Sequence, residues 1–285
     1  MTDDIRQQAI ALYDRFTHEG MPRRDFMTRM VALAGSAAAA EALIAGIAAS
    51  PAAAAVVPAD DKRLTTATRM IDGYKAYFAE PRSRSLKATV LVIHENRGLN
   101  DHIRDVARRL ALAGYRAVAP DLLTPAGGTP ANEDQARDLI GKLDLAKATA
   151  AGVAMLKTLK ATSRGGKVGV VGFCWGGAYV NRLAIAAGAD LSAGVAYYGP
   201  APNPSEAAKV QAPLLLHYAG LDDRVNATGK PWVAALRAAH KSVETFTYPG
   251  VNHAFNNDTS AERYNKPAAD MAWNLTLEFF KKHLG

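Results

Sequence analysis

Hydrophobic and polar positions change their pattern near residue 60. From Thr65 onward, short apolar runs alternate with longer amphipathic segments that end at glycine or polar residues. Two extended runs on either side of Asp72-Gly73 predict a hairpin, because such a dipeptide suits a tight two-residue turn. The run ATVLVIH at 88–94 is typical of a parallel strand that is buried on both faces.

The rest of this region predicts further alternation of strands and helices. Such alternation indicates an α/β fold, with a mostly parallel sheet and helices on both faces. Ligand sites in these folds lie at the carboxyl ends of the strands, so we expect functional residues in the loops that follow strands. The predicted strands are 116–119, 167–171, 193–198, 213–218 and 243–248, and the predicted helices are 101–113, 131–160 with a break near Gly141, 176–187, 229–240 and 265–283.

The first sixty residues form a separate region in this pattern. We therefore divide the chain into an N-terminal extension, 1–60, and a catalytic-type domain, 61–285. Residues 3–19 predict a short amphipathic helix. The segment 30–57 is mostly alanine and is interrupted by Glu41 and Pro51, so it is too weakly apolar to predict a stable membrane span.

An arginine pair within the extension suggests a targeting function. Arg23-Arg24 and Phe26 precede the weakly apolar segment, and Ala-x-Ala sites follow around 52–55, which resembles a twin-arginine export signal. Pro22 and Thr28 depart from that pattern. The sequence favours a periplasmic location, with a cytoplasmic protein that keeps an uncleaved N-terminal helix as the alternative. In both cases we expect this extension to carry no chemistry.

Composition narrows the possible functions. Hydrophobic residues make up 49% of the chain and charged residues 21%, as in a globular protein with a sizeable core. The net charge of +7 is spread over the sequence without a basic cluster, so we expect no nucleic-acid partner. The single cysteine, Cys174, excludes an intrachain disulfide framework and any metal site built on a pair of cysteines.

The loop after the strand 167–171 contains a candidate nucleophile. It reads Gly-Phe-Cys174-Trp175-Gly-Gly and leads into a helix, which is the pattern of a nucleophile elbow with cysteine in place of serine. The turn places Cys174 at a helix N-terminus, which stabilises a thiolate, and places the Trp175 N–H to donate to an oxyanion. The alternative is a buried cysteine at a glycine-rich packing turn.

Two later strand ends supply a candidate acid and base. Asp222 follows the strand 213–218, and His253 follows the strand 243–248. A carboxylate at such a position orients the imidazole of a histidine by accepting its Nδ1 hydrogen. The chain order of nucleophile, acid and base is that of α/β-hydrolases. Asp222 is preferred because a hydrophobic residue follows it three positions later, but the neighbouring Asp223 remains an alternative.

The loop after the strand 88–94 completes the set of candidates. We assign the second oxyanion N–H to Asn96, because this loop supplies it in α/β-hydrolases. Glu95 is placed to hydrogen-bond the thiol and to take its proton, and the alternative is a buried carboxylate that is salt-bridged to Arg97 or Arg104. Glycine at position 98 excludes a zinc-binding His-Glu-x-x-His motif, so we expect no metal.

Together these residues resemble the dienelactone hydrolase family, whose named activity is carboxymethylenebutenolidase. The resemblance covers roughly 65–285, and implies an α/β-hydrolase fold and a Cys174–His253–Asp222 triad with Glu95 as a partner, without a metal or organic cofactor. One departure concerns the substrate. The family's type enzymes place an arginine shortly after the histidine to bind a lactone carboxylate, whereas this chain has Asn-Asn-Asp at 256–258; Arg97 or Arg224 are the candidates to replace it. The motifs that carry the resemblance are HENRG at 94–98, IRD at 103–105, LA at 110–111, APDL at 119–122, GFCWGG at 172–177, Asp222 and GVNHAF at 250–255.

The sequence therefore predicts hydrolysis of a small ester or lactone through a thioacyl-enzyme. Two alternatives remain open. One is thioester hydrolysis or another acyl transfer on the same triad, and the other is a non-catalytic binding protein that keeps the fold. The expected partner is a small-molecule substrate, and the sequence gives no indication of an oligomeric state.

Overall fold

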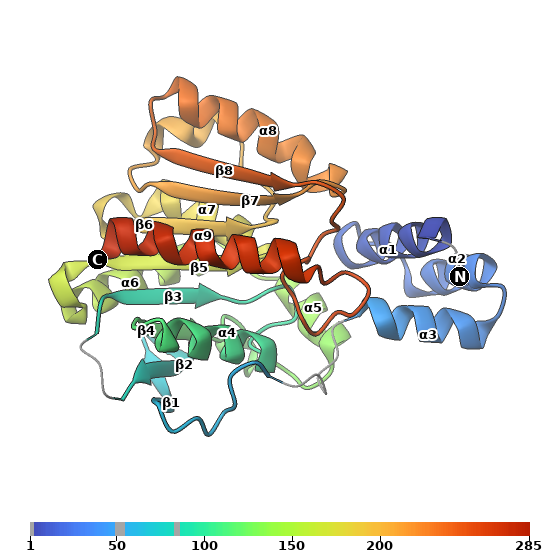
Figure 1. The fold of residues 1–285 in the computed structure, drawn as a ribbon, viewed down its shortest axis with the longest axis horizontal. Coiled ribbons are helices and arrows are strands. Elements are labelled where there is room, and N and C mark those ends of the chain that lie inside the picture. Colours follow the sequence, from blue (N-terminus) through green and yellow to red (C-terminus); the bar gives the residue numbers. More distant parts are fainter. Residues whose placement is uncertain (1–2, 49–54, 83–85) are drawn as a thin grey trace.

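The computed structural model describes residues 3–48, 55–82 and 86–285. Within them, an eight-stranded sheet forms the centre of the molecule, in the order β1-β2-β4-β3-β5-β6-β7-β8 (Figure 1). The strands β3 to β8 are parallel, and the β1–β2 hairpin adds an antiparallel edge. The strand bounds are Leu64–Ile71, Tyr74–Pro81, Thr89–Ile93, Arg116–Pro120, Val168–Phe173, Ala193–Tyr197, Leu214–Ala219 and Val243–Tyr248 for β1 to β8.

Helices cover both faces of this sheet, as the alternation of the sequence predicts. The alternate residues of β3 show how: Val90 and Val92 join the core under α4 and α9, while Leu91 and Ile93 join the core under α6, α7 and α8. All four side chains are fully buried, so the unbroken apolar run of this strand serves both faces. The bounds are α4 Asp101–Leu112, α5 Glu133–Gly141, α6 Leu145–Thr162, α7 Trp175–Ala186, α8 Asp223–Ala238 and α9 Lys266–Leu284.

Most predicted elements of this domain are confirmed to within a few residues, but one helix boundary was wrong. The hairpin turns at Asp72 and Gly73, which both have positive φ angles. The break near Gly141 separates α5 from α6. Helix α8, predicted from residue 229, begins at Asp223 because the Asp222 side chain accepts a hydrogen bond from the Val225 N–H (3.1 Å) and so caps it.

The N-terminal region folds into three helices with a small core of their own. They are α1 (Asp3–His18), α2 (Arg23–Ala34) and α3 (Ala37–Ile47), and we call them the helical unit. Phe16 of α1 stacks on Phe26 of α2, with ring centroids 4.3 Å apart. The chain then turns at Gly35, which has a φ of 83°, and Ser36 caps α3 by accepting from the Ala39 N–H.

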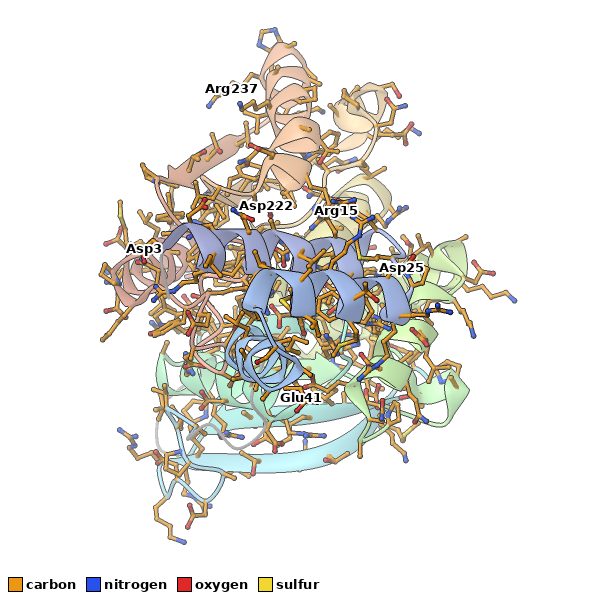
Figure 2. All side chains as sticks on the ribbon, turned by 90° about the vertical axis from the view of Figure 1, so that its right-hand side faces the viewer. Asp3, Arg15, Asp25, Glu41, Asp222 and Arg237 are labelled. Atoms are coloured by element: carbon orange, nitrogen blue, oxygen red, sulfur yellow. The ribbon has the colours of Figure 1, made fainter. Side chains whose placement is uncertain are left out.

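The helical unit lies against the carboxyl-terminal edge of the sheet (Figure 1). Figure 2 shows the molecule from that side, with α1 and α2 lying across the ends of the strands. At the end of α3, the Gly46 carbonyl accepts from the Glu262 N–H (3.0 Å), and the Ile47 carbonyl accepts from the Ser260 hydroxyl (2.6 Å). The first helix, which the sequence predicts at 3–19, thus belongs to a unit that covers the expected site.

The predictions on targeting concern the same helices. Arg23 and Arg24 begin α2, and of the predicted Ala-x-Ala sites, residues 52–54 lie outside the described residues. Across the described part of the chain, no single helix has the length and apolar character of a membrane span. Helices α2 and α3 reach this length and apolar character only when they are taken together, and the two helices meet at an angle of 107°. Export to the periplasm stays a prediction.

Candidate active site

Cys174 occupies a sharp turn between β5 and α7. Its φ of 54° and ψ of −115° are a strained combination for a residue other than glycine. The neighbouring glycines make the turn possible, because a Cβ on Gly172 would lie 2.2 Å from the Gly176 carbonyl oxygen, and one on Gly176 would lie 2.5 Å from the carbonyl oxygen of His94. The sequence Gly-x-Cys-x-Gly therefore fixes the thiol at the start of a helix, as the elbow pattern predicts.

Asp222 and His253 meet beside this turn, although they come from loops after different strands. The Nδ1 atom of His253 lies 2.5 Å from Oδ2 of Asp222. His253 is only 2% exposed, and its Nε2 has no hydrogen-bond partner among the described residues. The preference for Asp222 over Asp223 agrees with this geometry, because Asp223 is exposed in the first turn of α8.

His253 and Asp222 each stabilise the charged form of the other. Burial would lower the pKa of His253, but the negative charges of Cys174 and Asp222 outweigh it and raise that pKa to about 10. Burial would raise the pKa of Asp222, but the charge and hydrogen bond of His253 lower it below its usual range. The arrangement therefore favours an imidazolium on His253 that is held by the Asp222 carboxylate beside Cys174.

Glu95 lies in the pocket with Cys174, but its hydrogen-bond partners differ from those that we expected. Its Oε2 accepts from the side-chain amide of Asn257 (2.8 Å), and its Oε1 accepts a long hydrogen bond from the Tyr198 hydroxyl (3.5 Å). In the described residues it forms neither the predicted bond to the thiol nor a salt bridge to Arg97 or Arg104. Instead, two neutral donors, the Asn257 amide and the Tyr198 hydroxyl, each bind one of its carboxylate oxygens.

The loop after His253 explains why an arginine is missing there. Asn257 is used to hold Glu95, and Asp258 ties the loop to α4 by contacts with His102 (3.1 Å) and Arg109. Asn256 and Asn257 are both buried. The segment 256–258 is therefore a structural connection between the site and α4.

The two predicted oxyanion donors lie next to one another. Trp175 is the first residue of α7, so its N–H is at the end of the helix where donors have no partner within the helix. Asn96 follows β3 and lines the same cavity as Cys174 and Trp175. The Trp175 indole stacks on the buried ring of His94 (centroids 5.7 Å apart), which connects the two loops.

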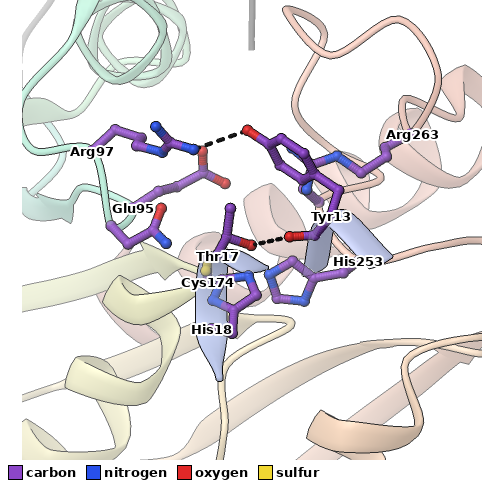
Figure 3. Close-up of a pocket in the computed structure, with 10 residues that line it drawn as sticks. Tyr13, Thr17, His18, Glu95, Arg97, Cys174, His253 and Arg263 are labelled. Atoms are coloured by element: carbon purple, nitrogen blue, oxygen red, sulfur yellow. Dashed lines mark hydrogen bonds between the residues drawn. The ribbon is translucent and has the colours of Figure 1, made fainter. Parts of the chain in front are cut away.

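Helix α1 contributes three residues to the catalytic pocket, which the sequence did not indicate. Tyr13, Thr17 and His18 line a narrow cavity of about 30 Å³ together with Cys174 and His253 (Figure 3). The rings of His18 and His253 lie 4.9 Å apart. We expected the N-terminal extension to carry no chemistry, and the structure places its first helix in the wall of this pocket. No local pattern in the sequence could show it, because it depends on how α1 packs against loops that lie 84 to 249 residues away, as in the contacts Tyr13–Arg97 and Asp14–Arg263.

Arginines surround this pocket, and two of them are engaged by α1. Arg97, predicted from sequence, lines the pocket and donates to the Tyr13 hydroxyl (2.9 Å). Arg263, which the sequence analysis missed, is buried, pairs with Asp14 (3.3 Å) and lies over the ring of Tyr13. Arg224, the other predicted arginine, lines a second and larger cavity of about 250 Å³ that also borders Cys174.

One group in the described residues has the composition of a metal site. The ligand atoms of His18, Cys174 and His253 all lie within 4.8 Å of one another. Burial and the positive charge of His253 lower the pKa of His18 well below its usual value, so its imidazole is neutral and able to coordinate. Nitrogen and sulfur ligands of this kind suit zinc, although the same three groups fit metal-free acyl chemistry equally well.

The sheet order, the elbow and the three strand-end residues together define an α/β-hydrolase fold. Comparison with known proteins agrees: the model of the dienelactone hydrolase family matches residues 74–284. The chain is 33% identical over 258 residues to an Escherichia coli O157:H7 protein named "Putative carboxymethylenebutenolidase", which covers 84% of this chain and 94% of that protein. A Saccharolobus solfataricus protein of the same name is 32% identical and covers 74% of this chain and 95% of its own length.

Solved structures show the same relationship. A dienelactone hydrolase-like promiscuous phosphotriesterase from metagenomic libraries superposes with a TM-score of 0.67 at 25% identity, over 78% of this chain and 100% of that one. The dienelactone hydrolase of Anabaena variabilis shares the fold with a TM-score of 0.61, at 22% identity, over 78% and 100% of the two chains. The chain belongs to the dienelactone hydrolase family, and it is a carboxylic ester hydrolase.

Proposed function

We propose that this protein hydrolyses small esters or lactones through Cys174, His253 and Asp222, with a thioacyl-enzyme intermediate. The observation that carries the proposal is the convergence of these residues, in which Asp222 holds His253 by Nδ1 and leaves Nε2 facing the strained cysteine turn. In acyl transfer, a base oriented in this way activates the nucleophile and later activates water.

The reaction follows from this arrangement. The Cys174 thiolate attacks the substrate carbonyl, and the tetrahedral oxyanion is stabilised by the N–H groups of Trp175 and Asn96. The C–O bond to the leaving group then breaks, and His253 gives its proton to the departing oxygen. Neutral His253 next takes a proton from water, whose oxygen attacks the thioester; collapse of the second intermediate releases the acid and restores the thiolate.

Glu95 and the arginines have supporting functions in this proposal. Glu95 forms the wall of the pocket beside Cys174 and is positioned by Asn257, so it affects the thiol through its charge and not as a resting hydrogen-bond partner. Arg97 and Arg224 line the smaller and the larger cavity at Cys174, respectively, and are the candidate contacts for polar groups of the substrate. The name of the Escherichia coli relative supports a lactone as one substrate to test.

The test is hydrolysis of p-nitrophenyl acetate and a panel of small lactones by the full chain and by Cys174→Ala. We expect the substitution to reduce kcat/KM by at least about 10³-fold, because it removes the nucleophile. Cys174→Ser should also be much slower, since the site is arranged for a thiolate. Circular dichroism checks that both variants are folded.

Alkylation provides an independent check on the nucleophile. Cys174 is the only cysteine of the chain, so loss of activity with iodoacetamide reports on that residue alone. Near wild-type rates in Cys174→Ala would disprove the proposal. A preference for thioesters over oxygen esters would favour the thioesterase alternative, and no turnover of any activated ester would favour a binding protein.

A further inference from the structure

The end of α1 lies at the junction of two cavities that meet at Cys174. The smaller one is polar and contains Glu95 and Arg263, while the larger one is lined by apolar groups such as Ile140 and Trp175, and also by Arg224. Thr17 and His18 line both cavities. They are therefore placed where the acyl part and the alcohol part of an ester would lie on either side of the attacked carbonyl.

The contacts of α1 hold it in this position. Three of its side chains reach residues of the pocket: Tyr13 accepts from Arg97, Asp14 pairs with Arg263, and His18 packs its ring against His253. Figure 3 shows Tyr13 pointing toward Arg97, and Thr17 and His18 lying beside Cys174 and His253. Arg263 is 9% exposed, so its charge depends on Asp14 for compensation. The domain thus has buried groups whose partners come from α1.

We propose that α1 is a working part of the active site, and that Thr17 and His18 determine which acyl and alcohol groups fit beside Cys174. This inference rests on the proposed function and extends it to the substrate. Because Arg97 and Arg263 are already engaged by Tyr13 and Asp14, the smaller cavity favours a short, uncharged group of the ester or lactone, and Arg224 of the larger cavity stays the candidate contact for a polar group. It also requires that the active protein keeps residues 3–47.

The substrate selectivity of variants tests directly whether Thr17 and His18 of α1 limit the groups that fit beside Cys174. Thr17→Leu adds bulk at the junction, and Ala11→Leu adds bulk on an exposed position of the same helix as a matched control. We expect Thr17→Leu to lower the ratio of kcat/KM for p-nitrophenyl butyrate to that for the acetate by on the order of tenfold, because pockets discriminate single methylene groups by about this factor or more. Ala11→Leu should leave the ratio unchanged.

A second measurement does not need turnover. Zn²⁺ bound by Cys174 and the two histidines should protect the thiol from iodoacetamide, and His18 is the ligand of that group that comes from α1. His18→Asn should raise the Zn²⁺ concentration for half-protection on the order of tenfold or more. His240→Asn, which changes an exposed histidine of the loop between α8 and β8, should have no effect.

The two readouts separate failure of this inference from failure of the proposed function. If esters are turned over through Cys174 but Thr17→Leu keeps the acetate-to-butyrate ratio of its control, α1 does not set the substrate. If Zn²⁺ protection is the same in His18→Asn and His240→Asn, α1 does not cover the site in solution. Protection that depends on His18, in a protein that hydrolyses no ester, would instead overturn the proposed function and leave the position of α1 in place.

Discussion

The catalytic domain and the helical unit are stabilised in different ways. The domain buries apolar side chains on both faces of its sheet, in two large clusters that extend over most of its helices. The helical unit has a separate and much smaller apolar core, and many of its contacts with the domain are polar, including Asp14 with Arg263, Tyr13 with Arg97, and Arg6 with Glu262. Polar interfaces of this kind are typical of parts that move relative to one another.

This difference shows how a stable fold can have an adjustable site. The residues of the triad are positioned by the sheet, where opening requires the loss of many buried contacts. The wall that faces them is positioned by charges and hydrogen bonds, which cost less free energy to separate. We therefore expect Cys174, the proposed nucleophile, to keep its position, and access to it to depend on the helical unit.

The largest effect is expected from a cavity in the sheet. Leu91 of β3 is fully buried, and Leu91→Ala should reduce the free energy of unfolding by about 2–5 kcal/mol. The measurement is the urea concentration at which half of the protein is unfolded, compared between variants whose unfolding free energy depends on urea with the same slope. Leu43→Ala, the same change in α3, should leave the midpoint of the domain nearly unchanged, because Leu43 belongs to the separate core. Equal shifts in both variants would show that the two regions unfold as one.

An effect that is confined to the helical unit is expected from a change in its own core. Phe16→Ala removes the stack on Phe26 and the contact with the Arg137 guanidinium, which lies 4.5 Å from the ring. A loss of about 3–5 kcal/mol exceeds what a core of this size can supply. We expect hydrogen exchange to increase throughout residues 3–47 and to remain slow in β3 and β5. Unchanged exchange in α1 would contradict the idea of a weakly held unit.

The sequence predicted the domain better than the helical unit for a physical reason. Cys174, Asp222 and His253 each follow a strand of a parallel sheet, and strand order alone brings such loops to one edge. Local patterns therefore predicted that these three residues lie close together, and they predicted most helices and strands. The start of α8 was missed because Asp222 both caps the helix and binds His253. The sequence analysis interpreted Asp222 as the partner of His253 and did not use it as a helix cap.

Long-range packing decides the features that the sequence did not indicate. The pattern of α1 predicts a helix and its buried face, but not which surface receives Tyr13, Thr17 and His18. Arg263 lies ten positions after His253, outside any local motif, and enters the pocket because the loop before α9 folds back toward α1. Such contacts depend on the shape of two folded units and not on spacing along the chain.

A pH-dependent effect should distinguish the two regions further. Burial, together with nearby positive charges, lowers the pKa of His18 when the helical unit is packed against the domain. The contribution of His18 to the free energy of this packing is therefore complete at pH values above the usual pKa near 6.5, and it decreases as the pH falls below that value. The contribution of Asp14 changes with pH in the opposite direction, because burial raises the pKa of its carboxyl above the usual 3.8 despite the charge of Arg263. This change occurs at lower pH than that of His18. The charges that face His18 are those of His253, Arg224, Arg263 and Arg97.

Exchange protection factors measure this effect. In α1 they should fall between pH 8 and pH 5.5, while those of β5 stay constant. His18→Asn should remove the dependence, and His240→Asn should keep it. A dependence that survives in His18→Asn would assign it to another group.

The smallest structural effect is expected at the arginine pair, where it separates folding from targeting. The Arg23 side chain is 70% exposed and pairs with Asp134 at the surface, so Arg23→Lys with Arg24→Lys should change stability by only about 0–1 kcal/mol. A twin-arginine signal would respond far more strongly, because the translocation machinery reads these two residues. We therefore expect the double variant to be retained in the cytoplasm with its fold and its ester selectivity intact, as judged by cell fractionation and by activity. If the variant and the wild type distribute equally, the arginine pair only supports the start of α2, and the helical unit is a permanent wall of a cytoplasmic enzyme. If export is lost and the exported wild type still carries residues 3–47 by intact mass, the same helices serve for targeting and for the active site.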